Sequence, residues 1–422
     1  MKKINGGVAA PIGFKASGLY CGIKKSKKKD LALIVSDRLC DAAGTFTTNK
    51  VQASCVVVNK DHLRDGKAQA IIANSGNANC MTGESGFENT RSMALAVSRI
   101  LGIRKKNVLV ASTGVIGKPL PIKKILSAVP QLVNDLDRKG SEFAAHAILT
   151  TDRMPKEIAM EFLVGRRKVR VGAIAKGAGM IHPEMEIHKP ATKASAPACR
   201  PGRGLRHATM LCFVTTDALI TPAALRDALD RAAQKTFNTI TIDGDMSTND
   251  MVVILANGAA QNKKIVEKTK EFRLFTRVLE TMFLSLAKQM IRDAEGATKF
   301  VEVFVKNASS REDARVVAKS VARSSLVKCA LFGEDPNWGR IAASAGYSGA
   351  NVDPWRLAIY LGKESVLRNG GRVKQNAAVL NRVFAQKNIK ITVDLGLGKS
   401  TATAYTCDLS TNYVRINSAY RT

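Results

Sequence analysis

The sequence predicts a mixed α/β or α+β fold, because segments with strand-like and helix-like patterns alternate along the chain. Short apolar runs that lead into polar or glycine-rich turns are typical of buried strands. Such runs occupy residues 68–79, 107–114, 251–258 and 357–362. Two further segments, 299–306 and 390–396, alternate apolar and polar residues as half-buried strands do.

Two helices can be placed between these strands. Thr221 followed by Pro222 combines a good N-cap with proline at the first helical position, so a helix is expected to begin there. A longer helix is expected over about 273–292, where Phe, Leu and Met residues recur at helical spacing. Such a stripe indicates packing in the core rather than a cofactor site.

The length and charge of the chain bound its class. A chain of 422 residues exceeds the usual size of one hydrophobic core, so two or three domains are expected. The net charge of +30 favours anionic partners, but the only dense basic run is Lys24–Lys29. Aromatic residues make up 5% and do not interleave with basic ones, which favours a solvated basic surface over a nucleic-acid site.

Cysteine usage and the N-terminus predict a cytoplasmic protein. The eight cysteines are scattered and form no CxxC pair, which suits a reducing compartment. Glycine and proline break the first apolar stretch, which makes it a poor signal peptide. No apolar run is long enough to span a bilayer, so no membrane partner is expected.

Several polar, glycine-containing segments lie beside apolar runs, as active-site loops often do. In ASTGVIG (111–117), a Thr-Gly turn can offer a hydroxyl and a backbone N–H to an oxyanion. In KGAGMIHP (176–183), glycines allow close backbone approach and a lysine can hold an anion. Thr209 stands just before the apolar run LCFV.

Taken together, these motifs resemble the ornithine acetyltransferase family of arginine biosynthesis, also called glutamate N-acetyltransferases. Each motif alone is weak, but nine of them occur in the family's order and approximate spacing over nearly the whole chain. They read SGNAN, STG, TTD..PK, KG.GM..P, ATML..TTDA, DGD.STND, EGATK, DPNWGRI and a terminal YVRIN…RT.

The resemblance implies an αββα sandwich of the N-terminal-nucleophile type with a smaller C-terminal α/β domain. It also implies that the chain cuts itself between Ala208 and Thr209, giving an alpha chain, 1–208, and a beta chain, 209–422, with a C-terminal subdomain over roughly 295–422. The two halves would stay together and assemble as two alpha and two beta chains.

The implied reaction moves an acetyl group from N-acetylornithine to glutamate through an acetyl-Thr209 intermediate. A threonine hydroxyl is a poor nucleophile without a base. The α-amine created by cleavage has an ordinary pKa of about 8, close to where a general base works well. No cofactor is implied. Whether acetyl-CoA is a second donor, which would add amino-acid N-acetyltransferase activity, stays open.

The resemblance also assigns site residues. Thr113, by its side chain, and Gly114, by its backbone N–H, would form the oxyanion hole. Lys176 would face the substrate carboxylate and Glu295 its cationic amine. The full set of implied substrate contacts is Thr150, Lys176, Thr209, Glu295, Asn417 and Thr422, with Thr151 as the neighbouring alternative to Thr150.

No metal site is expected. The paired aspartates of DGD (243–245) suit a hard cation, but no fitting set of further ligands follows, which favours a structural turn. His182, His188, Cys199 and His207 fit no common zinc spacing. DPNWGRI (335–341) is interpreted as structural support around the site.

One segment departs from the family. Residues 186–207, rich in Pro, Ala, Gly and basic residues, are expected to form a flexible basic loop directly before the scissile bond.

Two other functions are kept open. One is an N-terminal-nucleophile aminopeptidase, and the other is an uncleaved, inactive basic binding protein that would bind nucleic acid in a salt-dependent way.

Overall fold

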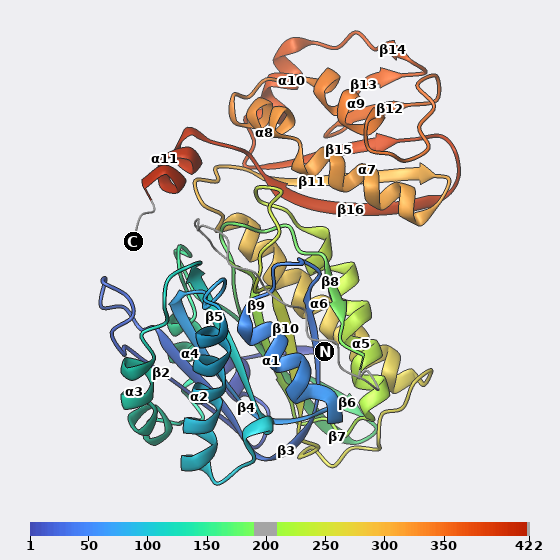
Figure 1. The fold of residues 1–422 in the computed structure, drawn as a ribbon. Coiled ribbons are helices and arrows are strands. Elements are labelled where there is room, and N and C mark those ends of the chain that lie inside the picture. The colour runs from blue at the N-terminus through green and yellow to red at the C-terminus, as the bar shows by residue number, and fades with distance from the viewer. Residues whose placement is uncertain (190–208, 420–422) are drawn as a thin grey trace. The chain divides into compact units, whose positions relative to one another are not determined.

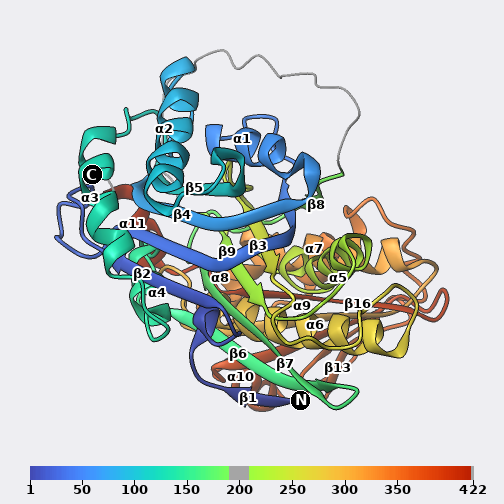
Figure 2. The same ribbon diagram turned by 90° about the horizontal axis from the view of Figure 1, so that it is seen from below.

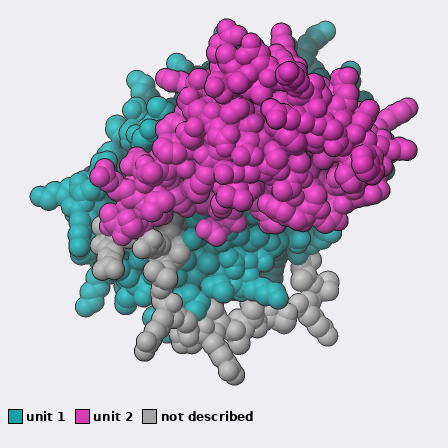
Figure 3. Space-filling view, turned by 90° about the horizontal axis from the view of Figure 1, so that it is seen from above, with its two compact units in different colours: residues 1–238, 246–287, 422 teal, residues 239–245, 288–421 magenta. Residues whose placement is uncertain are grey.

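A computed structural model of the chain describes residues 1–189 and 209–419, which divide into two compact units. The first unit comprises Met1–Asn238 and Met246–Ala287, and the second comprises Thr239–Asp245 and Lys288–Arg421 (Figure 3). The second unit thus contains most of the range expected for the C-terminal subdomain and adds 239–245. Residues on both sides of the expected cleavage site belong to the first unit.

The first unit is built on a ten-stranded sheet with the main order β1-β6-β7-β9-β10-β3-β4-β5. The long strand β3 joins its two parts, because its first half pairs with β2 and β4 and its second half with β10 and β8. The strands are β1 Lys2–Ile4, β2 Phe14–Leu19, β3 Leu31–Thr47, β4 Lys67–Asn77, β5 Val108–Val115, β6 Lys156–Val164, β7 Arg167–Lys176, β8 Met185–Ile187, β9 Leu211–Thr216 and β10 Met251–Ala256.

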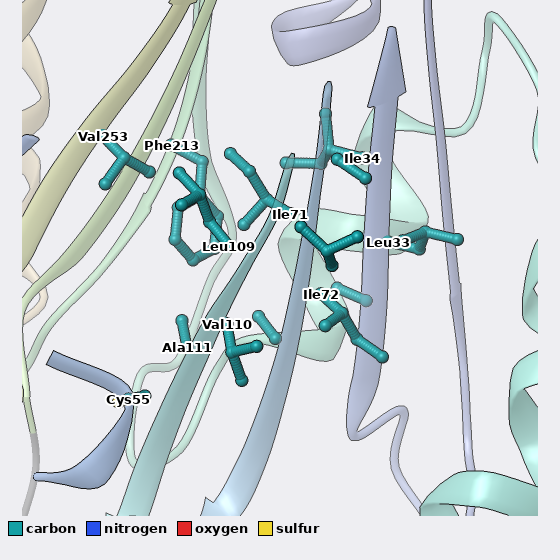
Figure 4. Packing of buried hydrophobic residues seen from close by; sticks show 14 of the residues in the cluster. Leu33, Ile34, Cys55, Ile71, Ile72, Leu109, Val110, Ala111, Phe213 and Val253 are labelled. Atoms are coloured by element: carbon teal, nitrogen blue, oxygen red, sulfur yellow. The ribbon is translucent and has the colours of Figure 1, made fainter. Parts of the chain in front are cut away.

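The central strands are buried on both faces, which explains why their sequences read as continuous apolar runs. All six residues of β9 and of β10 are buried. Figure 4 shows Leu109 of β5 and Ile71 of β4 beside Phe213 of β9, all in one core with Val253 of β10. The two parts of the sheet therefore pack against each other through these side chains.

Helices cover the outer sides of these strands (Figures 1 and 2). Helices α1 and α2 pack on β5, α3 and α4 pack on β2, and α5 packs on β3 and β8. The helices are α1 Ser54–His62, α2 Glu84–Leu101, α3 Ile122–Asn134, α4 Ser141–Ala147, α5 Pro222–Lys235 and α6 Lys270–Arg292, the last of which continues into the second unit. The predicted fold class, a mixed α/β sandwich, is confirmed.

Both predicted helices are present. Thr221 caps α5 by accepting a hydrogen bond from the Ala224 N–H, with Pro222 at the first position. The stripe on α6 is buried, as expected for core packing. No helix in the described part of the chain has the length and apolar character needed to cross a bilayer.

The second unit holds a six-stranded sheet with the order β14-β13-β12-β15-β11-β16. In its centre, β11 runs parallel to β15 and antiparallel to β16. The strands are β11 Phe300–Ala308, β12 Ala358–Leu361, β13 Glu364–Arg368, β14 Gly371–Arg372, β15 Asn388–Asp394 and β16 Ser400–Cys407. The helices are α7 Arg311–Arg323, α8 Ser325–Phe332, α9 Trp338–Gly346, α10 Ala377–Phe384 and α11 Thr411–Ala419.

Two polar motifs have structural roles in this unit. Asn337 of DPNWGRI is the N-cap of α9, and its side chain accepts the Arg340 N–H at 3.3 Å. Asp243 of the DGD turn accepts a hydrogen bond from the Tyr413 hydroxyl at 3.2 Å, and Gly244 has a φ of +83°.

The expected loop at 186–207 needs one correction. Glu186 and Ile187 form the end of β8 and pair with Phe46 and Thr45 of β3. Just after the strand, the His188 N–H donates to the Gly44 carbonyl. Residues 190–207 of this segment lie outside the described residues.

Candidate active site

The site lies in the first unit, where the ends of several strands bring polar residues together. Thr113 and Gly114 stand near the end of β5, and Lys176 is the last residue of β7. Because β7 pairs antiparallel with β9, Lys176 lies opposite Leu211 and therefore close to Thr209. The sheet thus brings side chains together from segments far apart in sequence.

Lys176 connects the threonines of the site. Its side chain is fully buried, and its ammonium donates to the Thr209 carbonyl and the Thr150 hydroxyl, both at 2.8 Å. It also donates to the Thr113 hydroxyl at 3.4 Å. One buried ammonium thus contacts three threonines of the site at once.

Asp152 balances the charge of this lysine. Its carboxylate lies 3.7 Å from the Lys176 ammonium and 2.8 Å from that of Lys156, and all three side chains are fully buried. It also accepts the Gly177 N–H at 2.7 Å. Burial alone would raise the pKa of Asp152, but Lys176 and Lys156 together hold it well below its ordinary value. Asp152 is therefore ionised and fixes Lys176 in place.

The Thr209 hydroxyl faces a second hydroxyl. Thr209 is 1% exposed, and its Oγ1 lies 2.8 Å from the Oγ of Ser247. The Ser247 hydroxyl also accepts the Asn249 N–H at 3.2 Å, and the Ser247 carbonyl accepts a hydrogen bond from the Thr47 side chain at 2.7 Å. Ser247 is thus held firmly against the nucleophile candidate.

The loop that carries Ser247 is tied to the strand that carries Thr113. The Asn249 side-chain amide donates to the carbonyls of Ala78 and Ser112, both at 2.8 Å. The carboxylate of Asp250 accepts the Met210 N–H at 2.9 Å. The backbone is consequently fixed at Thr209 by Lys176 and at Met210 by Asp250.

Gly114 meets the neighbouring strand so closely that only glycine fits. It has a φ of +133°, and a Cβ built on it would lie 2.4 Å from the carbonyl carbon of Gly76. The two glycines are paired in the parallel register of β4 and β5. This approach fixes the turn that follows Thr113, whose side chain is fully buried.

Two predicted substrate contacts lie in the second unit. The Asn417 side-chain amide on α11 donates to the Glu295 carboxylate at 2.8 Å and to the Tyr413 carbonyl at 3.1 Å. Glu295 is 8% exposed. The structure therefore describes the predicted site residues as two groups, one in each unit. Ala208 and Thr422 lie outside the described residues.

The structure distinguishes Thr150 from Thr151. The Thr150 hydroxyl accepts from Lys176, whereas the Thr151 hydroxyl is buried with no hydrogen-bond partner among the described residues. Sequence reasoning missed Ser247, Asp152 and Lys156 as parts of the cluster. Each lies in a segment already recognised as polar, TTDRMPK (150–156) or DGDMSTND (243–250), but composition alone did not single it out.

Comparison with known proteins decides the family. A sequence model of the ArgJ family matches residues 15–422. The chain belongs to the ArgJ family. The predicted resemblance is thereby confirmed.

Relatives in the ArgJ family match the chain end to end. It is 45% identical over 426 residues to the arginine biosynthesis bifunctional protein ArgJ of Caldanaerobacter subterraneus subsp. tengcongensis, with all of both chains covered. It is 46% identical over 424 residues to the protein of the same name from Symbiobacterium thermophilum, again with full coverage. A solved chain of ArgJ from Bacillus halodurans is 41% identical and matches with a TM-score of 0.48, covering 49% of this chain and 98% of that one.

Proposed function

We propose that this ArgJ-family chain is an acetyltransferase of arginine biosynthesis that moves an acetyl group from N-acetylornithine to glutamate through acetyl-Thr209. One observation carries the proposal. The Thr209 hydroxyl is buried in a polar cluster of Lys176, Thr113, Thr150 and Ser247, in a family whose named relatives are arginine biosynthesis proteins.

Maturation would begin in the uncut chain. The Thr209 hydroxyl oxygen attacks the Ala208 carbonyl carbon, the C–N bond breaks, and the acyl group moves from nitrogen to oxygen. Water then hydrolyses the ester and leaves Thr209 with a free α-amine. That amine does not exist before cleavage, so another group must take part in the first proton transfer. Ser247, at 2.8 Å from the Thr209 hydroxyl, is the group whose position suits this relay.

In turnover the new α-amine acts as the general base for the hydroxyl of its own residue. Thr209 attacks the acetyl carbonyl carbon of N-acetylornithine, and the ornithine nitrogen leaves with a proton. The amine of glutamate then attacks the acetyl-threonine ester and releases the Thr209 hydroxyl. Thr113 and Gly114 would stabilise the oxyanion in both steps, and loss of one such donor typically lowers kcat by about 10²–10³-fold.

The cluster also suggests how Lys176 contributes. In the structure its ammonium donates to groups of the protein, including the Thr113 hydroxyl of the proposed oxyanion hole. A substrate carboxylate would replace one of these acceptors when it binds. Lys176 would therefore both order the site before the substrate binds and hold the substrate carboxylate.

The remaining expectations form part of the proposal. No cofactor is required, and acetyl-CoA would serve as a second acetyl donor. The enzyme would work in the cytoplasm as two alpha and two beta chains. The sheet supports lasting association of the halves, because β9 and β10 from the beta chain lie between β7 and β3 from the alpha chain.

The test is acetyl exchange with the purified protein. N-acetylornithine carrying a labelled acetyl group is incubated with glutamate, and labelled N-acetylglutamate is measured. The proposal expects transfer by the wild-type protein and none by Thr209→Ala. Release of free amino acids from short peptides without acetyl transfer would instead indicate an aminopeptidase. Salt-dependent nucleic-acid binding by an inactive, uncut chain would indicate a binding protein.

A further inference from the structure

The lysine-rich segment near the N-terminus forms a defined loop anchored by a buried carboxylate. Asp30 is fully buried and accepts the backbone N–H groups of Cys21 and Ile23 at 2.7 Å and of Lys24 at 3.0 Å. The Lys24 ammonium closes the loop by donating to the Lys29 carbonyl at 2.7 Å. These bonds give the loop a fixed backbone, which a merely solvated charge run does not need.

Lys29 and Lys124 link the same loop to neighbouring segments of the chain. The Lys29 ammonium donates to the Gly18 carbonyl at 3.0 Å and lies 4.8 Å from the centre of the Phe143 ring. The Lys124 ammonium donates to the Gly22 carbonyl at 2.8 Å. The loop is therefore built by three lysines, while Lys25, Lys27 and Lys28 remain exposed.

The loop lies next to the predicted oxyanion hole. Side-chain carbons of Ile23 and Lys24 lie 3.0 and 3.2 Å from the position that a Cβ on Gly76 would take. Gly76 is in turn paired with Gly114. In addition, the Ser75 N–H donates to the Asp30 carbonyl at 2.9 Å, which ties the loop to β4 at this point.

Electrostatics agree with this placement. Burial lowers the pKa of Lys24 to about 8 in spite of nearby Asp30, and the positive charge of Lys176 adds to the lowering. Asp152 acts in the opposite direction, so Lys24 lies within electrostatic reach of both members of the Lys176–Asp152 pair. The exposed lysines extend this positive region outward. Residues 21–29 contain no acidic side chain, and Asp30, which follows them, is buried and accepts backbone N–H groups of the loop.

We propose that this loop, residues 21–29, binds the phosphate groups of a CoA thioester that acts as acetyl donor to Thr209. The proposal rests on the proposed acetyltransferase function. N-acetylornithine and glutamate carry no phosphate, so neither needs a row of exposed lysines. Several ammonium groups spread along the loop suit the several phosphates of CoA better than the single one of acetyl phosphate.

The chemical step balances without a further reactant. The Thr209 hydroxyl oxygen attacks the thioester carbonyl carbon, the C–S bond breaks, and CoA leaves as the thiol with the proton. The loop would hold the phosphates while the flexible arm of CoA carries the thioester inward past Gly76. The resulting acetyl-Thr209 is the same intermediate as the one formed from N-acetylornithine.

The test compares donors that differ in phosphate content. The donors are acetyl-CoA, S-acetylpantetheine, which has the same thioester but no phosphate, acetyl phosphate and N-acetylornithine, each with glutamate as acceptor. The variant is the triple Lys25→Gln, Lys27→Gln, Lys28→Gln. The control triple is Lys263→Gln, Lys264→Gln, Lys268→Gln, which removes the same charge from another exposed segment of the first unit.

The proposal expects a selective loss. In the loop variant the KM for acetyl-CoA should rise roughly tenfold, equivalent to about 1.4 kcal/mol of binding free energy. Its KM values for S-acetylpantetheine and N-acetylornithine should stay unchanged, and so should all KM values of the control triple. The wild-type preference for acetyl-CoA over S-acetylpantetheine should shrink with added salt, because salt screens exposed charges.

Three results would overturn the proposal. One is a wild-type enzyme that uses N-acetylornithine but not acetyl-CoA. A second is an equal effect of the loop variant on every donor, which would assign the lysines to glutamate binding. A third is loss of the acetyl phosphate reaction alone, which would assign the loop to that donor. A protein that transfers acetyl from none of these donors would refute the proposed function itself.

Discussion

At the scale of single residues, Asp152 determines how the centre of the site is arranged. It is a fully buried carboxylate placed between two fully buried lysines, and it also accepts a backbone N–H from Gly177. Three buried charges are tolerated because each has a partner of opposite sign or a hydrogen bond. The position of Lys176, and with it that of Thr113, Thr150 and Thr209, depends on this carboxylate.

Asp152→Asn should therefore destabilise the protein by about 3–5 kcal/mol at neutral pH, because it leaves buried lysines without their counter-charge. Chemical denaturation of the two proteins measures this difference. The matched control is Asp217→Asn, since Asp217 is also fully buried but its carboxylate is held by the backbone N–H groups of Ile12 and Arg170 rather than by buried lysines.

The ion pairs of Asp152 with Lys176 and Lys156 also predict how the stability of the protein depends on pH. Because the pKa of Asp152 is held below its ordinary value, its stabilisation is complete above about pH 5 and is lost as the pH falls through the folded pKa. The gap in stability between wild type and Asp152→Asn should narrow in acid. Burial raises the pKa of Asp217, so its carboxylate becomes protonated in the folded protein as the pH falls. The wild-type protein should therefore gain stability relative to Asp217→Asn in acid, the opposite of the trend for Asp152→Asn. A gap for Asp152→Asn that is constant from pH 7 to 3 would contradict this account.

Ser247→Ala should slow self-cleavage by about 10²-fold or more while leaving the fold intact, because it removes the hydroxyl beside Thr209. The fraction cut over time, followed by gel electrophoresis, measures the effect, and Ser247→Thr should restore part of the rate. Ser17→Ala is the control, since Ser17 is equally buried but donates to the Leu132 carbonyl. Cleavage at the wild-type rate in Ser247→Ala would rule out a relay role.

The residues of the site differ in how far the sequence could predict them. Thr113, Gly114, Lys176 and Thr209 stand in motifs whose order along the chain carries information. Ser247 and Asp152 could not be predicted, because serine and aspartate are ordinary in polar loops. Only the fold shows that these two side chains lie within hydrogen-bond or ion-pair distance of Thr209 and Lys176.

At the scale of elements, the site depends on where strands end. The last residues of β5 and β7 and the residues just before β9 supply its side chains. Continuous apolar runs predicted β4, β5 and β10 because these strands are buried on both faces. The double pairing of β3 was not predictable, since it depends on a register irregularity between Val35 and Cys40 in its pairing with β4. The end of β8 was missed because three residues carry too little pattern.

Gly114→Ala should abolish cleavage and strongly destabilise the chain. A Cβ there would lie 2.4 Å from backbone carbon of Gly76, at a φ of +133° that alanine rarely adopts. Gly102→Ala is the control, because Gly102 has a φ of +65° but no atom within 4 Å of an added Cβ. It should cost only about 1 kcal/mol. Thermal unfolding distinguishes the two, and equal losses would show that the close strand approach is unimportant.

At the scale of the whole molecule, the expected halves are interleaved in one sheet. The expected boundary at residue 208 precedes β9, and the sheet order places β9 and β10 between β7 and β3. Cleavage would therefore break one peptide bond but leave the strand pairing of the sheet intact. The sequence predicted two or three domains from length alone, but it could not show that the compact units differ from the cleavage halves.

After cleavage the two pieces should elute together in size-exclusion chromatography under native conditions and separate only in denaturant. The reason is that β9 pairs with β7 and β10 pairs with β3, and both of these partner strands belong to the other piece. Uncut Thr209→Ala protein provides the reference for elution. Release of a free 209–422 piece in native buffer would contradict the sheet order described above.

The most direct test of the central claim is intact mass spectrometry of the purified protein beside Thr209→Ala. Self-cleavage should give two pieces from the wild-type protein, one ending at Ala208 and one beginning at Thr209, and a single full-length chain from the variant. A single uncut chain in both samples would contradict the N-terminal threonine mechanism and leave the buried Thr209 hydroxyl without its proposed role.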